Sequence, residues 1–108
     1  RFVDASIEGW YSYLYGDPSS ANTLIQKDNK EMTIELLYYA REEMKQRGIV
    51  NSGDSELLGI GAMTNDRWKS FYEMMKDQKI YSPDLNYKEA YTLKFINNKK
   101  WINFENNY

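Results

Sequence analysis

One segment of the chain, Gly59–Met75, joins a glycine-containing turn directly to an amphipathic helix. One face of this helix carries apolar side chains at i, i+3, i+4 and i+7, namely Trp68, Phe71, Tyr72 and Met75. Gly59 and Gly61 give the backbone the freedom that a tight turn needs. Thr64 or Asn65 is placed to accept hydrogen bonds from the first N–H groups of the helix. The segment therefore predicts a helix that begins at a tight turn and packs through one face.

The first half of the chain predicts three more helices. The first ends at Gly16, which we expect in the left-handed conformation. Asp17 is predicted to cap the second, with Pro18 at its first position. The third and longest spans residues 30–47 and ends at the glycine that follows. The apolar faces of the three helices consist of Val3, Ile7, Trp10, Tyr11 and Leu14, then Ala21, Leu24 and Ile25, and then Leu36, Leu37, Ala40 and Met44.

A loop separates the third helix from the helix that follows Gly59. Polar and glycine residues at 51–54 mark this loop, and three apolar residues follow it, Leu57, Leu58 and Ile60. We expect all three to be buried, which makes the stretch an ordered connection and not a linker.

A fifth helix is predicted over residues 86–97. Aromatic residues recur there every four positions, at Tyr87, Tyr91 and Phe95. Asn86 and Glu89 have the spacing of a capping box, which marks a helix N-terminus. No segment alternates as a strand does, so the chain is predicted to be all-α, with about five helices in a compact array.

Composition excludes several classes of function. The 108 residues contain no cysteine and no histidine, and they carry a formal net charge of −2 without a block of like charge. The missing residue types exclude zinc sites of the usual kind, disulfides, thiol nucleophiles and a histidine general base. The charge pattern argues against nucleic-acid binding. The length suits one domain with a modest core, and no apolar run approaches the roughly 20 residues of a membrane-spanning helix.

Two pairs of carboxylates are candidates for acid–base catalysis, Glu42 with Glu43 and Asp54 with Glu56. Neighbouring residues on a helix point apart, and a raised pKa needs burial that the sequence does not indicate. We therefore predict no catalytic residue, no metal and no cofactor, and we do not expect an enzyme.

The aromatic residues admit two interpretations. Trp10 and Tyr11, together with Trp68 and Tyr72, could stack on a flat heterocycle or belong to the core, and their helical spacing favours the core. Five further tyrosines are expected to be exposed and would suit an interface, namely Tyr13, Tyr15, Tyr38, Tyr39 and Tyr81.

The turn before the fourth helix also admits two interpretations. Backbone N–H groups at a helix N-terminus can hold an anion, and the candidate ligand-binding residues there are Gly61, Met63 and Thr64. Thr64 occupies the place of the third glycine of a dinucleotide fingerprint, and no strand precedes the turn. We favour a structural turn and keep the three residues as candidates.

Three colinear segments carry a resemblance to a known family. Residues 48–71 read GIVNSGDSELLGIGAMTNDRWKSF, residues 85–97 read LNYKEAYTLKFIN, and residues 1–25 read RFVDASIEGWYSYLYGDPSSANTLI. Together they resemble the C-terminal part of ABC-transporter solute-binding proteins of the thiamine-pyrimidine-precursor, sulfonate, taurine and nitrate group. The resemblance covers residues 1–97, and the tail at 99–108 carries none.

The resemblance implies a two-lobed α/β protein with the type II periplasmic-binding-protein fold. Residues 1–98 would be its C-terminal helical segment, followed by the tail at 99–108. The implied function is capture of a small molecule, a thiamine pyrimidine precursor or a sulfonate- or nitrate-like anion, and its delivery to permease subunits. One related family of pyrimidine-synthesis enzymes supplies its own active-site histidine, which this chain lacks.

Location and partners follow from the same resemblance. We expect an extracytoplasmic bacterial protein, periplasmic or lipid-anchored at the cell surface. The sequence opens on RFVDAS without a signal peptide, so in an exported protein it would follow the signal. Without the remaining lobes of its own chain, the fragment should expose an apolar patch or hide it in a homodimer. The alternative is a free-standing helical protein-interaction module.

Overall fold

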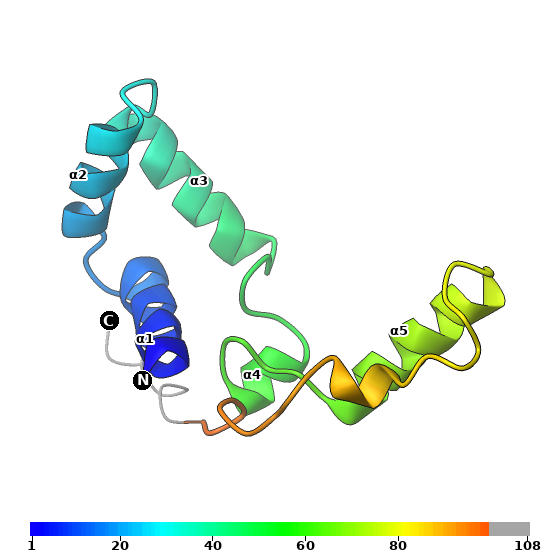
Figure 1. Cartoon of the computed structure of the whole chain (residues 1–108). Coiled ribbons are helices and arrows are strands. Elements are labelled where there is room, and N and C mark those ends of the chain that lie inside the picture. Colours follow the sequence, from blue (N-terminus) through cyan, green and yellow to red (C-terminus); the bar gives the residue numbers. More distant parts are fainter. Residues whose placement is uncertain (100–108) are drawn as a thin grey trace.

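A computed structural model describes residues 1–99 of the chain. Its elements, in chain order, are α1 (Phe2–Tyr15), α2 (Ser19–Asp28), α3 (Ile34–Gln46), α4 (Asp54–Leu58), α5 (Asn65–Asp77) and the 3₁₀ helix η1 (Tyr87–Glu89), as Figure 1 shows. No strand occurs within residues 1–99, so the all-α prediction with five helices is confirmed. The tail predicted at 99–108 lies, apart from Lys99, outside the described residues.

Helices α1–α4 form the body of the protein, in which α2 and α3 make a helical hairpin (Figure 1). The core cluster lies along one face of α1 and consists of Ile7, Tyr11 and Leu14 packed with Ile60. Three of the five residues predicted for that face are thus buried. Val3 packs against the cluster at its edge, whereas Trp10 keeps 42% of its surface exposed. Four buried side chains thus make up this core cluster.

Helix α1 ends differently from the prediction. Gly16 has φ −100° and ψ −152°, which is an extended and not a left-handed conformation. The guanidinium of Arg41 on α3 explains the difference, since its Nε donates to Tyr13 O at 2.6 Å and its Nη2 to Gly16 O at 3.1 Å. A side chain from another helix thus satisfies the Tyr13 carbonyl in the last turn of α1, which a left-handed C-terminal motif would otherwise satisfy, and also bonds the Gly16 carbonyl.

Helices α2 and α3 both begin later than predicted. The Asp17 carboxylate accepts hydrogen bonds from the backbone N–H of Ser19 at 2.9 Å and from its hydroxyl at 2.5 Å, while Pro18 takes the capping position instead of the first helical one. Helix α3 begins at Ile34 and not at residue 30, because the hydroxyl of Thr33 accepts the N–H of Leu36 at 3.2 Å and fixes the start there.

The C-terminus of α3 follows the prediction. Gly48 has φ +58°, and the N–H of Ile49 donates to Met44 O at 3.0 Å. The N–H of Gly48 also donates to Lys45 O at 3.2 Å, which completes a Schellman motif. The next stretch contains the unpredicted short helix α4, in which Leu57 is 72% exposed, so the expected burial of Leu57 is wrong.

Residues 65–91, which we call the arm, consist of α5 and the segment that returns along it. The helix predicted after Gly59 is confirmed as α5, and the Thr64 hydroxyl accepts the N–H of Arg67 at 3.2 Å. The return runs antiparallel to α5, because Tyr87 stacks on Tyr72 and Tyr91 stacks on Trp68, with ring centroids 4.7 and 4.6 Å apart.

The fifth helix predicted over 86–97 is wrong, since only the single turn of η1 forms there. The four-residue spacing of Tyr87 and Tyr91 matches that of Trp68 and Tyr72 on α5, so it serves stacking between segments and not a helical face. The Asn86 amide donates to the Glu89 carboxylate at 2.9 Å, a bond between side chains in place of a capping box.

The arm extends the molecule in one direction. The described fold measures 48 × 32 × 27 Å, with a Cα radius of gyration of 17.1 Å. A close-packed domain of this length has a radius of gyration of about 13 Å. Helix α5 points away from α1–α3 in Figure 1 and packs against η1, which accounts for the difference.

Candidate functional site

The predicted anion-binding turn lies against α1. Gly59 and Gly61 have φ values of +100° and +83°, so both use the conformational freedom of glycine. Between them, the buried N–H of Ile60 donates to the hydroxyl of Tyr11 at 3.0 Å. A Cβ atom on Gly61 would lie 3.6 Å from Cγ1 of Ile7. The turn is therefore part of the core packing.

The polar groups of the predicted ligand residues bond within the chain. The N–H of Met63 donates to the Asn97 side-chain oxygen at 3.2 Å, and the Asn97 amide donates back to Met63 O at 2.7 Å. The Met63 sulfur accepts the Trp68 indole N–H at 3.4 Å. The Thr64 hydroxyl is the N-cap of α5. An anion bound here would have to displace Asn97 and approach Asp66, whose charge lies in the first turn of α5.

The four aromatic residues considered for a stacking pocket do not meet in one site. Tyr11 is buried in the core of the body, and Tyr72 is buried in the arm. Trp68 stacks on Tyr91 at an interplanar angle of 2°. Only Trp10 lines an open hollow, which lies between α1, α2 and α3.

This α1–α3 hollow is an apolar concavity of the body, with a volume of about 550 Å³. Its lining consists of Ser6, Gly9, Trp10, Tyr13, Ala21, Ile25, Met32, Leu37, Ala40 and Met44. A volume of this size lies in the range of small-molecule pockets and of grooves that accept a side chain or helix. The sequence predicted a single apolar face for α1. It missed that Trp10 belongs to a second apolar face, which lines the hollow.

Gly9 is an unusual residue for the wall of this hollow. It lies in the middle of α1, where glycine costs about 1 kcal/mol relative to alanine. A Cβ atom on Gly9 would meet nothing within 4 Å. No contact among the described residues therefore requires a glycine at this position.

A polar pair, Asn22 with Tyr13, lies beside the hollow. Asn22 is fully buried, and its side-chain oxygen accepts the hydroxyl of Tyr13 at 3.1 Å. The amide nitrogen of Asn22 has no hydrogen-bond partner among the described atoms. Asn22 was not among the residues that the sequence predicted to be buried or functional.

The exposed tyrosines fall into two groups. Tyr38 and Tyr39 on α3 are exposed as predicted. The predicted exposure of the other three is wrong, because Tyr13, Tyr15 and Tyr81 are half-buried. Tyr15 accepts the Asn51 amide at 3.0 Å, and Tyr81 makes an edge contact with Phe71.

Three of the four carboxylates considered for acid–base chemistry pair with cations. Glu42 lies 2.7 Å from Lys45, Glu43 lies 2.5 Å from Arg47, and Asp54 pairs with Arg67. Residues 1–99 contain no group of three acidic residues arranged to hold a metal ion. Within the same range, no helix combines the length and apolarity needed to cross a membrane.

No family model, curated protein or solved structure matches the chain.

Proposed function

We propose that the chain is the C-terminal helical portion of a solute-binding component of an ABC importer, and that the α1–α3 hollow receives the remaining lobes of that longer protein. The uncovered hollow carries the proposal. Among the apolar side chains that line it, Trp10 keeps 42% and Ile25 keeps 36% of its surface exposed. A contiguous apolar surface of this kind marks an interaction site on most soluble proteins.

Gly9 supports a covering surface that approaches α1 closely. A helix-interior glycine destabilises the isolated helix, and the described residues offer no packing that compensates for it. A backbone or side chain seated in the hollow would use the space that a Cβ would fill. The resemblance of residues 1–97 supplies the identity of the covering surface.

The proposed mechanism is capture of a small molecule between two lobes, with binding energy stabilising the closed form that the permease recognises. The ligand would be a thiamine pyrimidine precursor or a sulfonate- or nitrate-like anion, and the protein would act outside the cytoplasm. Gly61, Met63 and Thr64 would take part only if the ligand replaced Asn97 at the Met63 N–H. No bond is broken, so the function needs no catalytic residue.

The covered hollow is tested by Gly9→Leu. In the 108-residue chain the leucine side chain enters open space, so thermal unfolding should shift little or upward. In the protein encoded by the whole gene, read upstream of Arg1, the same change should lower the free energy of unfolding by about 1–3 kcal/mol through overpacking. Glu8→Leu, one residue away on an exposed position, is the matched control. An equal loss of stability from Gly9→Leu in both proteins would refute the proposal that the rest of the protein covers the hollow.

The ligand is tested by thermal shift on the whole gene product. A thiamine pyrimidine precursor, taurine and nitrate are added separately at a hundredfold excess over the dissociation constant expected of a binder. One of them should raise stability by about 2.7 kcal/mol. If none shifts unfolding while Gly9→Leu behaves as predicted, the covering stands and the ligand assignment fails.

The alternative function is a free-standing helical module that binds other proteins. Tyr38 and Tyr39 are exposed on α3, and tyrosine suits half-wet interfaces. A start codon immediately before Arg1, with a monodisperse chain that unfolds cooperatively, would favour this function over transport.

A further inference from the structure

The arm is held together by its own contacts. Beyond the two stacked aromatic pairs, the Tyr72 hydroxyl donates to Ser82 O at 3.2 Å and to Pro83 O at 2.9 Å. The Tyr91 hydroxyl donates to the Asn65 side chain at 2.6 Å and ties the end of the return to the start of α5. These contacts fix both ends of α5 to the returning segment, so the arm moves as one unit.

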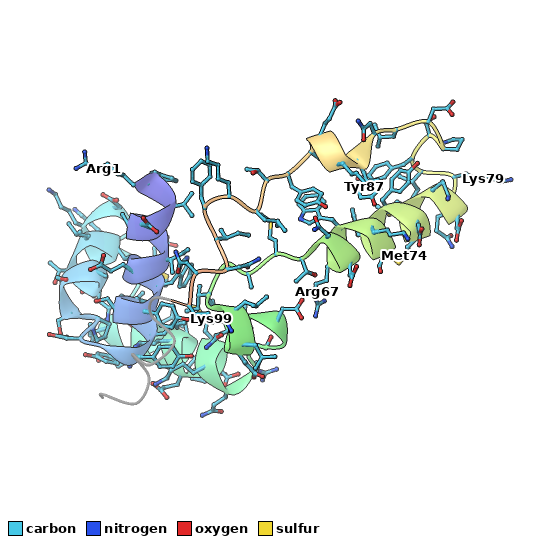
Figure 2. All side chains as sticks on the ribbon, turned by 90° about the horizontal axis from the view of Figure 1, so that it is seen from below. Arg1, Arg67, Met74, Lys79, Tyr87 and Lys99 are labelled. Carbon is cyan, nitrogen blue, oxygen red and sulfur yellow. The ribbon has the colours of Figure 1, made fainter. Side chains whose placement is uncertain are left out.

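Two chain segments, residues 59–64 and 92–97, connect the arm to the body, and we call them the neck. Figure 2 shows both segments running between the body and the arm. The reciprocal hydrogen bonds of Asn97 with Met63 join the two segments. Gly59 and Gly61 lie at the body end of the first segment, where Ile60 is docked on α1, so the positions between Gly61 and α5 are the ones that can pivot. The neck therefore joins the arm to this docked turn through two short segments that a crosslink keeps together.

Outside the neck, one charged contact among residues 1–99 joins the arm to the body. The Arg67 guanidinium on α5 pairs with the Asp54 carboxylate at the start of α4, and it also lies 3.4 Å from the position of a Cβ on Gly53. Both partners are exposed, at 70% for Arg67 and 37% for Asp54. Exposed pairs of this kind shift a two-state equilibrium only about 1.4- to 5-fold, and salt screens them.

We propose that the neck is a hinge and that the Arg67–Asp54 pair is its latch, so that the arm pivots against the body as the latch opens. Hinges absorb motion at a few backbone positions between rigid units, and the structure has these parts. The weak latch makes the orientation of the arm depend on ionic strength. This inference concerns the chain by itself and does not depend on the proposed transport function.

The chain contains no cysteine, so spin labels can be attached at two introduced cysteines without removing native ones. Ser12 on α1 and Ser70 on α5 are exposed and report on the arm relative to the body. Ser12 with Ser20 on α2 reports on the body alone. Distance distributions come from double electron–electron resonance on the 108-residue chain.

The Ser12–Ser70 distribution should be broader than the Ser12–Ser20 distribution. Arg67→Gln should raise the population of chains with the arm displaced from the body about 1.4- to 5-fold. Salt at about 1 M should raise this population in the wild-type chain in the same way, but should not raise it further in the variant. Lys69→Gln removes the same charge from a pair within the arm, Lys69 with Glu73, and should leave the distribution unchanged.

A second variant tests the hinge apart from the latch. Asn97→Ala removes the crosslink of the neck and should broaden the distribution with the ion pair intact, while circular dichroism reports that the helices persist. A Ser12–Ser70 distribution as narrow as that of Ser12–Ser20 overturns the hinge. A broad distribution that responds equally to Arg67→Gln and Lys69→Gln overturns the latch.

Discussion

The buried hydrogen bond between Tyr11 and Ile60 allows a direct test of the body core. Tyr11 is 1% exposed and Ile60 4% exposed, and the N–H of Ile60 donates to the Tyr11 hydroxyl at 3.0 Å. Tyr11→Phe keeps the ring and removes the acceptor. The N–H of Ile60 then stays buried without a partner, because the aromatic ring continues to exclude water.

Leaving a buried donor unpaired costs about 1–3 kcal/mol. With a urea m-value of about 2 kcal/mol/M, a cost near 2 kcal/mol lowers the unfolding midpoint by about 1 M. Far-UV circular dichroism in urea measures this shift. Tyr39→Phe is the matched control, because Tyr39 is 63% exposed and its loss should change stability by no more than about 0.5 kcal/mol.

Hydrogen exchange tests the same bond locally. The Ile60 amide should be protected in the wild-type chain and should exchange about 30-fold faster in Tyr11→Phe, the factor that corresponds to about 2 kcal/mol. Equal midpoints for Tyr11→Phe and Tyr39→Phe, with an unprotected Ile60 amide in the wild type, would refute the argument that this turn is docked on α1.

Four further predictions concern two glycines, the carboxylate of Asp17 and the Asn22–Tyr13 pair. Gly48→Ala should lower the free energy of unfolding by about 1–2 kcal/mol, because Gly48 has φ +58° and a Cβ would lie 2.9 Å from Ser52 Cβ. Gly9→Ala should raise the free energy of unfolding of the 108-residue chain by about 1 kcal/mol, because alanine favours a helix interior. Urea unfolding measures both changes. Hydrogen bonds from the hydroxyl and then the backbone N–H of Ser19 lower the pKa of the Asp17 carboxyl below its ordinary 3.8. The folded-state pKa lies below the unfolded one, so the stabilisation is complete above pH 3.8 and is lost as the pH falls through the folded value. The Tm difference between the wild type and Asp17→Asn should therefore shrink on acidification from about pH 6 to about pH 2. Asn22→Leu combined with Tyr13→Phe should destabilise less in urea than Asn22→Leu alone, because the double change removes the Tyr13 hydroxyl together with the oxygen that accepts its hydrogen bond.

The sequence predicted those parts of the fold that depend on local patterns. The spacing of Ile7, Tyr11 and Leu14 predicted the buried face of α1, and Gly48 predicted the end of α3. Thr64 was one of two predicted caps of α5 and is the one that forms. Each of these signals lies within a few residues of the feature that it determines.

Contacts between distant residues explain most of the errors. Arg41 reaches Gly16 across 25 positions and replaces the left-handed cap expected of that glycine. Asn97 bonds Met63 across 34 positions and occupies the N–H considered for a ligand. The recurring tyrosines of the return match the spacing of α5 and not of a helix of their own. No periodicity in the sequence specifies such pairings.

The hollow and the arm show two different kinds of incomplete packing. The arm stacks its aromatic rings on one another, and the exposed Arg67–Asp54 pair is its one charged contact with the body among residues 1–99. The hollow leaves Trp10 half covered and retains a helix-interior glycine that no described neighbour requires. Gly9→Ala should therefore stabilise the isolated chain, whereas a surface seated in the hollow should oppose the larger Gly9→Leu. If substitution at Gly9 stabilises the isolated chain but destabilises the whole gene product, the hollow is a surface shaped for a partner. If the change in stability has the same sign in both proteins, the hollow is a poorly packed part of the core.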